Sequence, residues 1–281
     1  MIDITVMDQG SGLRQLAMRT APPVLSVLHH GDRMAELTLL WQLCSALQNH
    51  GYAVTVLDGT AEESEKNAGL LNMLEQPYGP APVQDSAKWT VIPSALGLHY
   101  LAGQRAKVQM QERLSHMLAD ASVLIVYADA QALSSLQSTP NTCRPVVALM
   151  PETSSLLTAY QGIKRLAGHT RPAEVIAVTV SPLDTPEYLA EGIAKSLQNC
   201  TMNFLKCPVR HVSTQLKNHA SPVVEQAPEG IRQLALQLLG QAVAPVVMQA
   251  MPSIVTSVSE LASPPVSARP KVAHDQRLWS H

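Results

Sequence analysis

The sequence has 281 residues, of which 46% are hydrophobic and 15% charged, so it can bury a large core and is not a disordered chain. Its formal net charge of -2 lacks the basic excess on which nucleic-acid binding depends, so we expect no nucleic-acid partner. The sequence shows no long apolar run, no cationic and apolar leader and no CxxC spacing among its four cysteines. We therefore expect a cytoplasmic protein with reduced thiols and no transmembrane helix.

Strands and helices alternate from residue 24 onward. The apolar run Val24–Leu28 predicts a buried strand, residues 34–49 predict a helix that Gly51 closes, and Tyr52–Leu57 predicts a second strand. A strand, a helix and a strand within so short a stretch indicate a right-handed βαβ unit. Residues 60–93 show a less regular pattern.

The alternation continues through the second half of the chain. We expect helices over 104–119, 154–167, 186–204 and 229–244, and strands over 122–127, 145–150, 174–180 and, in a short form, 209–212. Nearly continuous apolar strands between amphipathic helices predict an α/β fold, a mostly parallel sheet with helices on both faces. The expected organisation is an N-terminal segment (1–20), an α/β domain (21–252) and a flexible tail (253–281).

The turn after the first strand is where a parallel α/β sheet commonly binds a phosphate group. A phosphate-binding turn is rich in glycine and carries a Lys and a Ser or Thr. This turn has one glycine, Gly31, and carries Asp32 and Glu36, whose charges repel phosphate. His29 and His30 lack the spaced further ligands of a metal site, so we expect them to be solvated loop residues.

Residues 24–60 can be aligned without a gap to a pattern of the MinD/ParA superfamily of P-loop ATPases, and the chain resembles in particular its flagellar-number regulators, called FlhG or FleN. The family's deviant Walker A loop reads KGGxGKT. The positions of this motif are occupied here by Gly31 for the first Lys, Asp32 and Arg33 for the first two glycines, Ala35 for the last glycine, Glu36 for the invariant Lys and Leu37 for the Thr.

Two further acidic positions of the family can be compared. The first Asp of its Asp-x-Asp motif is kept as Asp58, which we expect to form a turn, whereas the second is Thr60. The Walker B position near Val126 is apolar. The resemblance thus implies a P-loop NTPase-like fold of the deviant Walker A type with a degenerate nucleotide site. We expect a pseudo-ATPase with no catalytic residue, no metal site and no cofactor.

Two other segments carry the resemblance. Residues 151–164 are similar to the family's T-P-E-P-T-S-L-x-D-A-Y-x-x-I-K segment, and residues 8–16 resemble its DQAxxLR motif, with Gly10 in place of Ala. In that family the second motif binds the signal-recognition-type GTPase FlhF and stimulates its GTP hydrolysis. The resemblance implies the same role for five residues here, namely Asp8, Gln9, Leu13, Arg14 and Leu16.

The expected function is therefore regulation of flagellar biosynthesis or flagellar number, with an FlhF-like GTPase and flagellar basal-body components as partners. The protein would be recruited through its partner to the cell pole or the membrane periphery. Residues 230–251 carry one cation, Arg232, and Pro245 interrupts them, so we expect this helix to pack on the domain with at most weak membrane contact.

Two alternatives stay open at this point. The first is a MinD-like switch ATPase with a remodelled phosphate loop, for which ATP and magnesium would be the cofactors. The second is a non-enzymatic scaffold subunit of another MinD-type system.

Overall fold

The computed structural model describes residues 22–64, 66–75, 89–103, 122–136, 144–170, 172, 174–215 and 227–249. The N-terminal segment 1–20, the expected helix over 104–119 and the expected tail 253–281 lie outside these residues.

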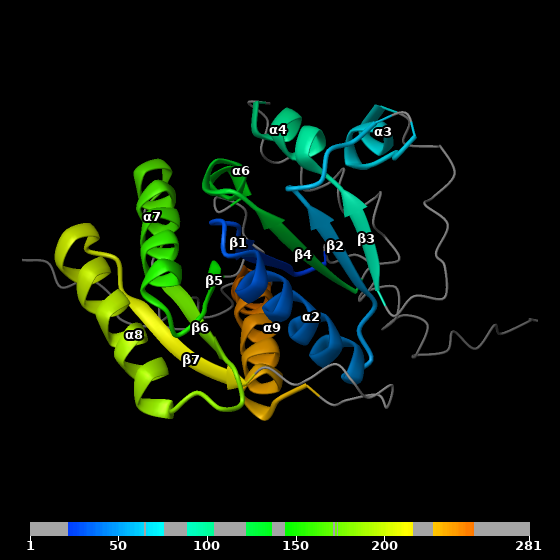
Figure 1. The fold of residues 1–281 in the computed structure, drawn as a ribbon. Coiled ribbons are helices and arrows are strands. Elements are labelled where there is room, and N and C mark those ends of the chain that lie inside the picture. Colours follow the sequence, from blue (N-terminus) through cyan, green and yellow to red (C-terminus); the bar gives the residue numbers. More distant parts are fainter. Residues whose placement is uncertain are drawn as a thin grey trace, which may run out of the picture.

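A single parallel sheet organises the described part of the chain (Figure 1). Its strands are β1 (Val24–Leu28), β2 (Val54–Asp58), β3 (Thr90–Pro93), β4 (Val123–Ala128), β5 (Val146–Leu149), β6 (Val175–Ser181) and β7 (Val209–Gln215). They lie in the order β3-β2-β4-β1-β5-β6-β7, and every neighbouring pair is parallel. The predicted parallel sheet is thus confirmed.

Helices cover both faces of this sheet, as predicted. One face carries α2 (Arg33–Asn49) and α9 (Glu229–Gln249). The other face carries α3 (Leu70–Glu75), α4 (Ala95–Gly103), α6 (Ala130–Leu136), α7 (Thr153–His169) and α8 (Glu187–Cys200). Successive strand residues point to opposite faces, so Leu25 and Val27 of β1 enter the first core and Val24 and Leu28 the second. A central strand covered on both faces must be apolar throughout, which explains the continuous pattern of β1.

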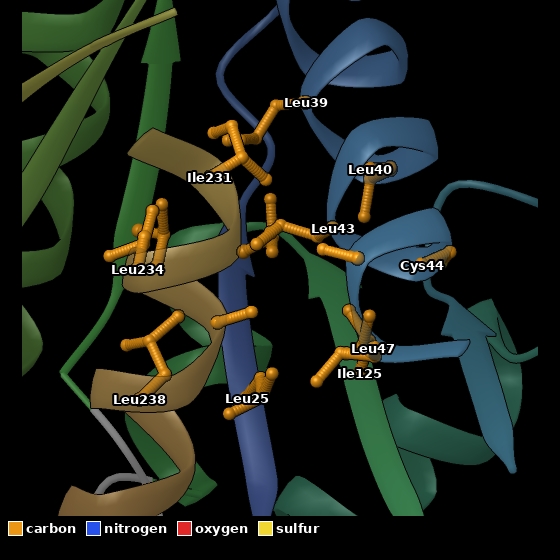
Figure 2. Packing of buried hydrophobic residues seen from close by; sticks show 14 of the residues in the cluster. Leu25, Leu39, Leu40, Leu43, Cys44, Leu47, Ile125, Ile231, Leu234 and Leu238 are labelled. Atoms are coloured by element: carbon orange, nitrogen blue, oxygen red, sulfur yellow. The ribbon is translucent and has the colours of Figure 1, made fainter. Parts of the chain in front are cut away.

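The α2–α9 contact forms the centre of the first core (Figure 2). Leu39 and Leu43 of α2 face Ile231 and Leu238 of α9, and all four side chains are fully buried. The expectation that this helix packs on the domain is confirmed for its first half. The expected interruption at Pro245 was wrong, because α9 continues to Gln249. A proline removes one helical hydrogen bond, which bends a helix without necessarily ending it.

The two edge strands account for most of the other differences. β3 lies within the stretch that lacked a regular pattern, and β7 runs three residues beyond the expected 209–212, to Gln215. An edge strand is paired on one side and exposed on the other, so its apolar pattern is diluted; Val91 of β3, for example, is exposed. The helix expected over 186–204 is α8, which continues into the π-helix η1 (Thr201–Leu205).

Two short helices flank β3 in the chain, α3 before it and α4 after it, and sequence periodicity did not predict either of them. The Glu63 carboxylate joins them, since it accepts hydrogen bonds from the amides of Leu71 (3.2 Å) and Gly97 (3.0 Å). Each amide lies in the first turn of its helix, where the chain leaves backbone donors without a helical partner. One side chain therefore fixes the two helices against each other.

In the described part of the chain, no helix is long and apolar enough to cross a membrane.

Candidate functional site

The candidate site lies at the carboxyl end of the sheet, in the turn that joins β1 to α2. The His29 amide donates to the Ala128 carbonyl at the end of β4 (2.8 Å), which ties this turn to the neighbouring strand. Gly31 has a φ of 109°, a backbone conformation that side-chain-bearing residues rarely adopt. Asp32 then caps α2 by accepting from the Ala35 amide (3.2 Å).

The Glu36 carboxylate turns back from the first turn of α2 into the loop that precedes it. Its Oε1 accepts from two successive backbone amides, those of His30 (2.8 Å) and Gly31 (2.9 Å). Its Oε2 accepts from the Tyr127 hydroxyl (2.5 Å) and lies 2.9 Å from Nδ1 of His29. The side chain is completely buried, so these four donors replace its hydration.

These contacts keep Glu36 ionised in spite of its burial. Burial alone would raise the pKa of this carboxyl, but the hydrogen bonds from His29, Tyr127 and the His30 amide outweigh it and lower the pKa from 4.5 to about 2. The same hydrogen bond to Glu36 raises the pKa of His29 above 6.5. Burial, together with the hydrogen bond to Glu36, raises the pKa of the Tyr127 hydroxyl. The turn therefore holds a fixed negative charge with a histidine beside it.

His30 is anchored in a different direction, toward β5 and α7. Its Nε2 lies 2.8 Å from the Ala148 carbonyl, which can only accept, so Nε2 carries a proton. Its Nδ1 lies 3.2 Å from the Thr158 hydroxyl. Burial lowers the pKa of this ring, which favours the neutral form.

The expectation that both histidines are solvated loop residues was wrong. The His30 side chain is completely buried and that of His29 is 32% exposed. The reason is the Glu36 carboxylate, which draws the loop against the end of the sheet. In the described part of the chain, no group of three or more His, Cys, Asp or Glu residues could hold a metal ion.

The other residues of the expected degenerate site separate into two groups. Asp32 faces inward, where its second oxygen accepts from the Ser155 hydroxyl of α7. Arg33 and Leu37 instead line a groove of about 360 Å³ on the outer side of α2, together with Met34, Thr38 and Trp41. Leu37 is half exposed.

Asp58 forms the turn that the sequence predicted. Its Oδ1 accepts from both the amide (2.9 Å) and the hydroxyl (2.7 Å) of Thr60, so the two residues that follow the end of β2 fold over the carboxylate. The proposed partner-binding residues, Asp8, Gln9, Leu13, Arg14 and Leu16, lie outside the described residues.

Sequence reasoning missed Tyr127, the next residue after the apolar Val126. Tyr127 is the one side chain with a polar group in the otherwise apolar strand VLIVYA, and that was the available signal. A buried tyrosine hydroxyl normally has a hydrogen-bond partner. The identity of that partner, 91 residues away in the sequence, could not be read from the pattern. The role of Ser155 was missed for the same reason, since its partner Asp32 is 123 residues away.

Comparison with solved structures places this site in a fold of known type. The chain is similar to cobyrinic acid a,c-diamide synthase from Mycobacterium smegmatis, with a TM-score of 0.50, 16% sequence identity and coverage of 78% of this chain and 94% of the enzyme. A second structure of that enzyme, with bound ATP analog and magnesium, matches with a TM-score of 0.50 and 15% identity over the same shares of the two chains. This likeness confirms the P-loop NTPase-like α/β fold class.

MinD/ParA-family ATPases are among the other similar structures. The MinD cell division protein of Aquifex aeolicus matches with a TM-score of 0.48 and 13% identity, over 78% of this chain and 97% of MinD. A ParA family ATPase from Chlorobium tepidum TLS matches with a TM-score of 0.47 and 14% identity, over 81% and 98% of the two chains. No family model and no curated protein matches the sequence.

Proposed function

We propose that this chain is a regulator built on a MinD/ParA-type fold that acts without a nucleotide switch, and that it binds and activates an FlhF-like GTPase through residues 8–16. In this proposal the protein controls flagellar biosynthesis, and the GTP chemistry takes place in the partner. The observation that supports the loss of nucleotide binding is the position of the Glu36 carboxylate.

The residues of the β1–α2 turn do not fit the phosphates of ATP or the magnesium that accompanies them. In a phosphate loop, backbone amides at the helix N-terminus point at the phosphate oxygens. Here the amides of His30 and Gly31 donate to Glu36 instead. A phosphate charge about 4 Å from this ionised carboxylate would be repelled by roughly 4 kcal/mol at an effective dielectric constant of about 20.

The neighbouring side chains add to this mismatch. The family places a Lys and a Thr where this chain has Glu36 and Leu37. The positive charge that would attract a phosphate is therefore replaced by a negative one, and the hydroxyl is replaced by a purely aliphatic side chain. Leu37 is half exposed in a groove on the outer side of α2 and offers no oxygen to a metal ion.

The activating role rests on the N-terminal motif. Leu13 and Leu16, three residues apart, would form one apolar stripe if the segment became helical on a partner, and Asp8 could cap the start of that helix. Gly10 and Gly12 favour a segment that folds on binding, since glycine has wide conformational freedom. Arg14 or Gln9 would then reach toward the nucleotide of the partner.

Calorimetric titration of the full-length chain with Mg-ATP and with Mg-ADP tests the first half of the proposal. We expect no heat of binding from either nucleotide. Binding of either one would contradict the loss of the nucleotide switch and would favour the alternative of a switch ATPase with a remodelled loop.

A GTPase assay with the FlhF-like partner tests the second half. The wild-type chain should stimulate GTP hydrolysis, and a triple variant with Asp8→Ala, Gln9→Ala and Leu13→Ala should not. Asp3→Ala is the matched control, because it removes an acidic side chain from the same segment outside the motif. Equal stimulation by the triple variant and the control would refute the assigned role of residues 8–16, in favour of a scaffold without a GTPase partner.

A further inference from the structure

The donors around Glu36 come from two parts of the fold. Three belong to consecutive residues of the β1–α2 loop, the His29 ring and the amides of His30 and Gly31, and the fourth is the Tyr127 hydroxyl on β4. The positive φ of Gly31 turns the chain so that the two amides point to one oxygen. Successive amides in such a conformation form a concavity, or nest, that binds anions. Each carboxylate oxygen has two donors.

Capping of α2 does not require this arrangement. Asp32 already caps the helix, since its side chain accepts from the Ala35 amide. The amides that donate to Glu36 belong to residues that precede the cap, and its other two partners are His29, directly after β1, and Tyr127 on β4. The four donors are therefore arranged as in a binding site for a separate oxyanion. In this chain the Glu36 carboxylate takes the place of that oxyanion.

We propose that the β1–α2 turn is a small-carboxylate site and that Glu36 is its built-in ligand. The native chain keeps this site permanently filled, so the loop stays in its anion-bound conformation whatever the supply of free anions. This inference deepens the proposed function and rests on it in one respect: a regulator that needs no nucleotide must hold this loop by other means. Removing the Glu36 side chain beyond its Cβ leaves the four donors around a space that free formate would fill.

The structure also limits which anion fits. The four donors form hydrogen bonds to the two oxygens of one planar group. The site is closed to solvent, since the Glu36 side chain has no exposed surface. A monoanionic carboxylate has two oxygens, and each of them would find two donors, with Tyr127 and His29 both directed at one of the two. Inorganic phosphate carries additional oxygens for which this donor set has no partner, so we expect formate to bind better than phosphate.

Chemical rescue tests this proposal. Thermal unfolding of Glu36→Ala is followed as sodium formate replaces sodium chloride at constant ionic strength. We expect the midpoint to fall in chloride and to rise toward the wild-type value with a saturable dependence on formate. The folded-to-unfolded ratio should increase about elevenfold when formate reaches ten times its dissociation constant.

Four comparisons make the result specific. The wild type should not respond to formate, because its site is filled. Glu36→Gln should not respond either, because its amide group occupies the same space. Glu152→Ala is the matched control, since it removes an exposed carboxylate at the start of α7, and it should behave as the wild type. Addition of Tyr127→Phe to Glu36→Ala should weaken the rescue by removing one donor.

Each possible outcome of the rescue experiment either supports or contradicts the proposal. Formate-dependent stability of Glu36→Ala alone supports the proposal, and so does folding of this variant only when formate is present. An equal effect of formate on all variants, no effect on Glu36→Ala, or failure of this variant to fold at any formate concentration would overturn it. Stronger rescue by inorganic phosphate than by formate would overturn the assignment to carboxylates. Since the readout is stability, failure of GTPase stimulation or the discovery of nucleotide binding by the wild type would refute the proposed function without deciding this test.

Discussion

Replacing Tyr127 by Phe removes one hydroxyl from the centre of the candidate site and leaves the ring that packs in the core. The lost hydrogen bond has an ionised acceptor, the Glu36 carboxylate, at 2.5 Å. Hydrogen bonds to charged groups contribute about 1.5–3 kcal/mol to stability. The loss of stability is larger when the partner left behind is buried, because it then has neither the hydrogen bond nor water. The full lowering of the Glu36 pKa, from 4.5 to about 2, corresponds to roughly 3 kcal/mol and combines all donors with the opposing effect of burial.

We therefore expect Tyr127→Phe to lower the free energy of unfolding at neutral pH by about 2 kcal/mol. Urea unfolding measured over a range of pH checks this value. Glu36 stabilises the fold above pH 4.5, where its carboxyl is ionised in both states, and this contribution is lost as the pH falls through about 2. The variant should have a higher Glu36 pKa, so its acid unfolding should begin at a higher pH than that of the wild type.

The matched control is Tyr188→Phe. Tyr188 lies on α8 and is 70% exposed, so loss of its hydroxyl should change stability by less than about 0.5 kcal/mol. If Tyr127→Phe also stayed within this limit and unfolded at the same acid pH as the wild type, the hydroxyl would not be stabilising the Glu36 charge. The reasoning about the site would then be refuted.

Two further predictions concern the histidines of the turn. His29→Gln should destabilise the fold most below pH 6.5, because Glu36 stabilises the protonated His29 ring more than the neutral one. The difference from the wild type should shrink as the pH rises through the raised pKa of His29. Urea unfolding at several pH values checks this, and a difference that grew with pH would contradict it. Gly162→Ala on α7 should cost about 1–3 kcal/mol, because the new Cβ would lie 2.8 Å from the Cβ of His30. Gly168→Ala on the same helix meets nothing within 4 Å and should be neutral or stabilising in the same unfolding measurement.

The sequence by itself determined the main features of the fold. Central strands are covered on both faces, so β1 and β4 must be apolar along their whole length, and this local pattern is readable without a structure. The βαβ unit and the replacement of phosphate-loop residues, with Glu36 at the position of the invariant Lys, were also readable, because they lie within one short stretch. The edge strand β3, which is four residues long and partly exposed, carries too weak a pattern to be found this way.

The contacts of the candidate site were decided by the tertiary structure. From the sequence, Glu36 was an acidic residue in a turn, and its charge was expected to act on an approaching ligand. In the fold it is a buried acceptor, because the sheet order places β4 beside β1 and so brings Tyr127, 91 residues away, to its carboxylate. Local patterns record which face of an element is buried, but a hydrogen bond between remote residues depends on the order in which the strands pair. The order of the strands in the sheet therefore brings two histidines, a glutamate and a tyrosine together in one site.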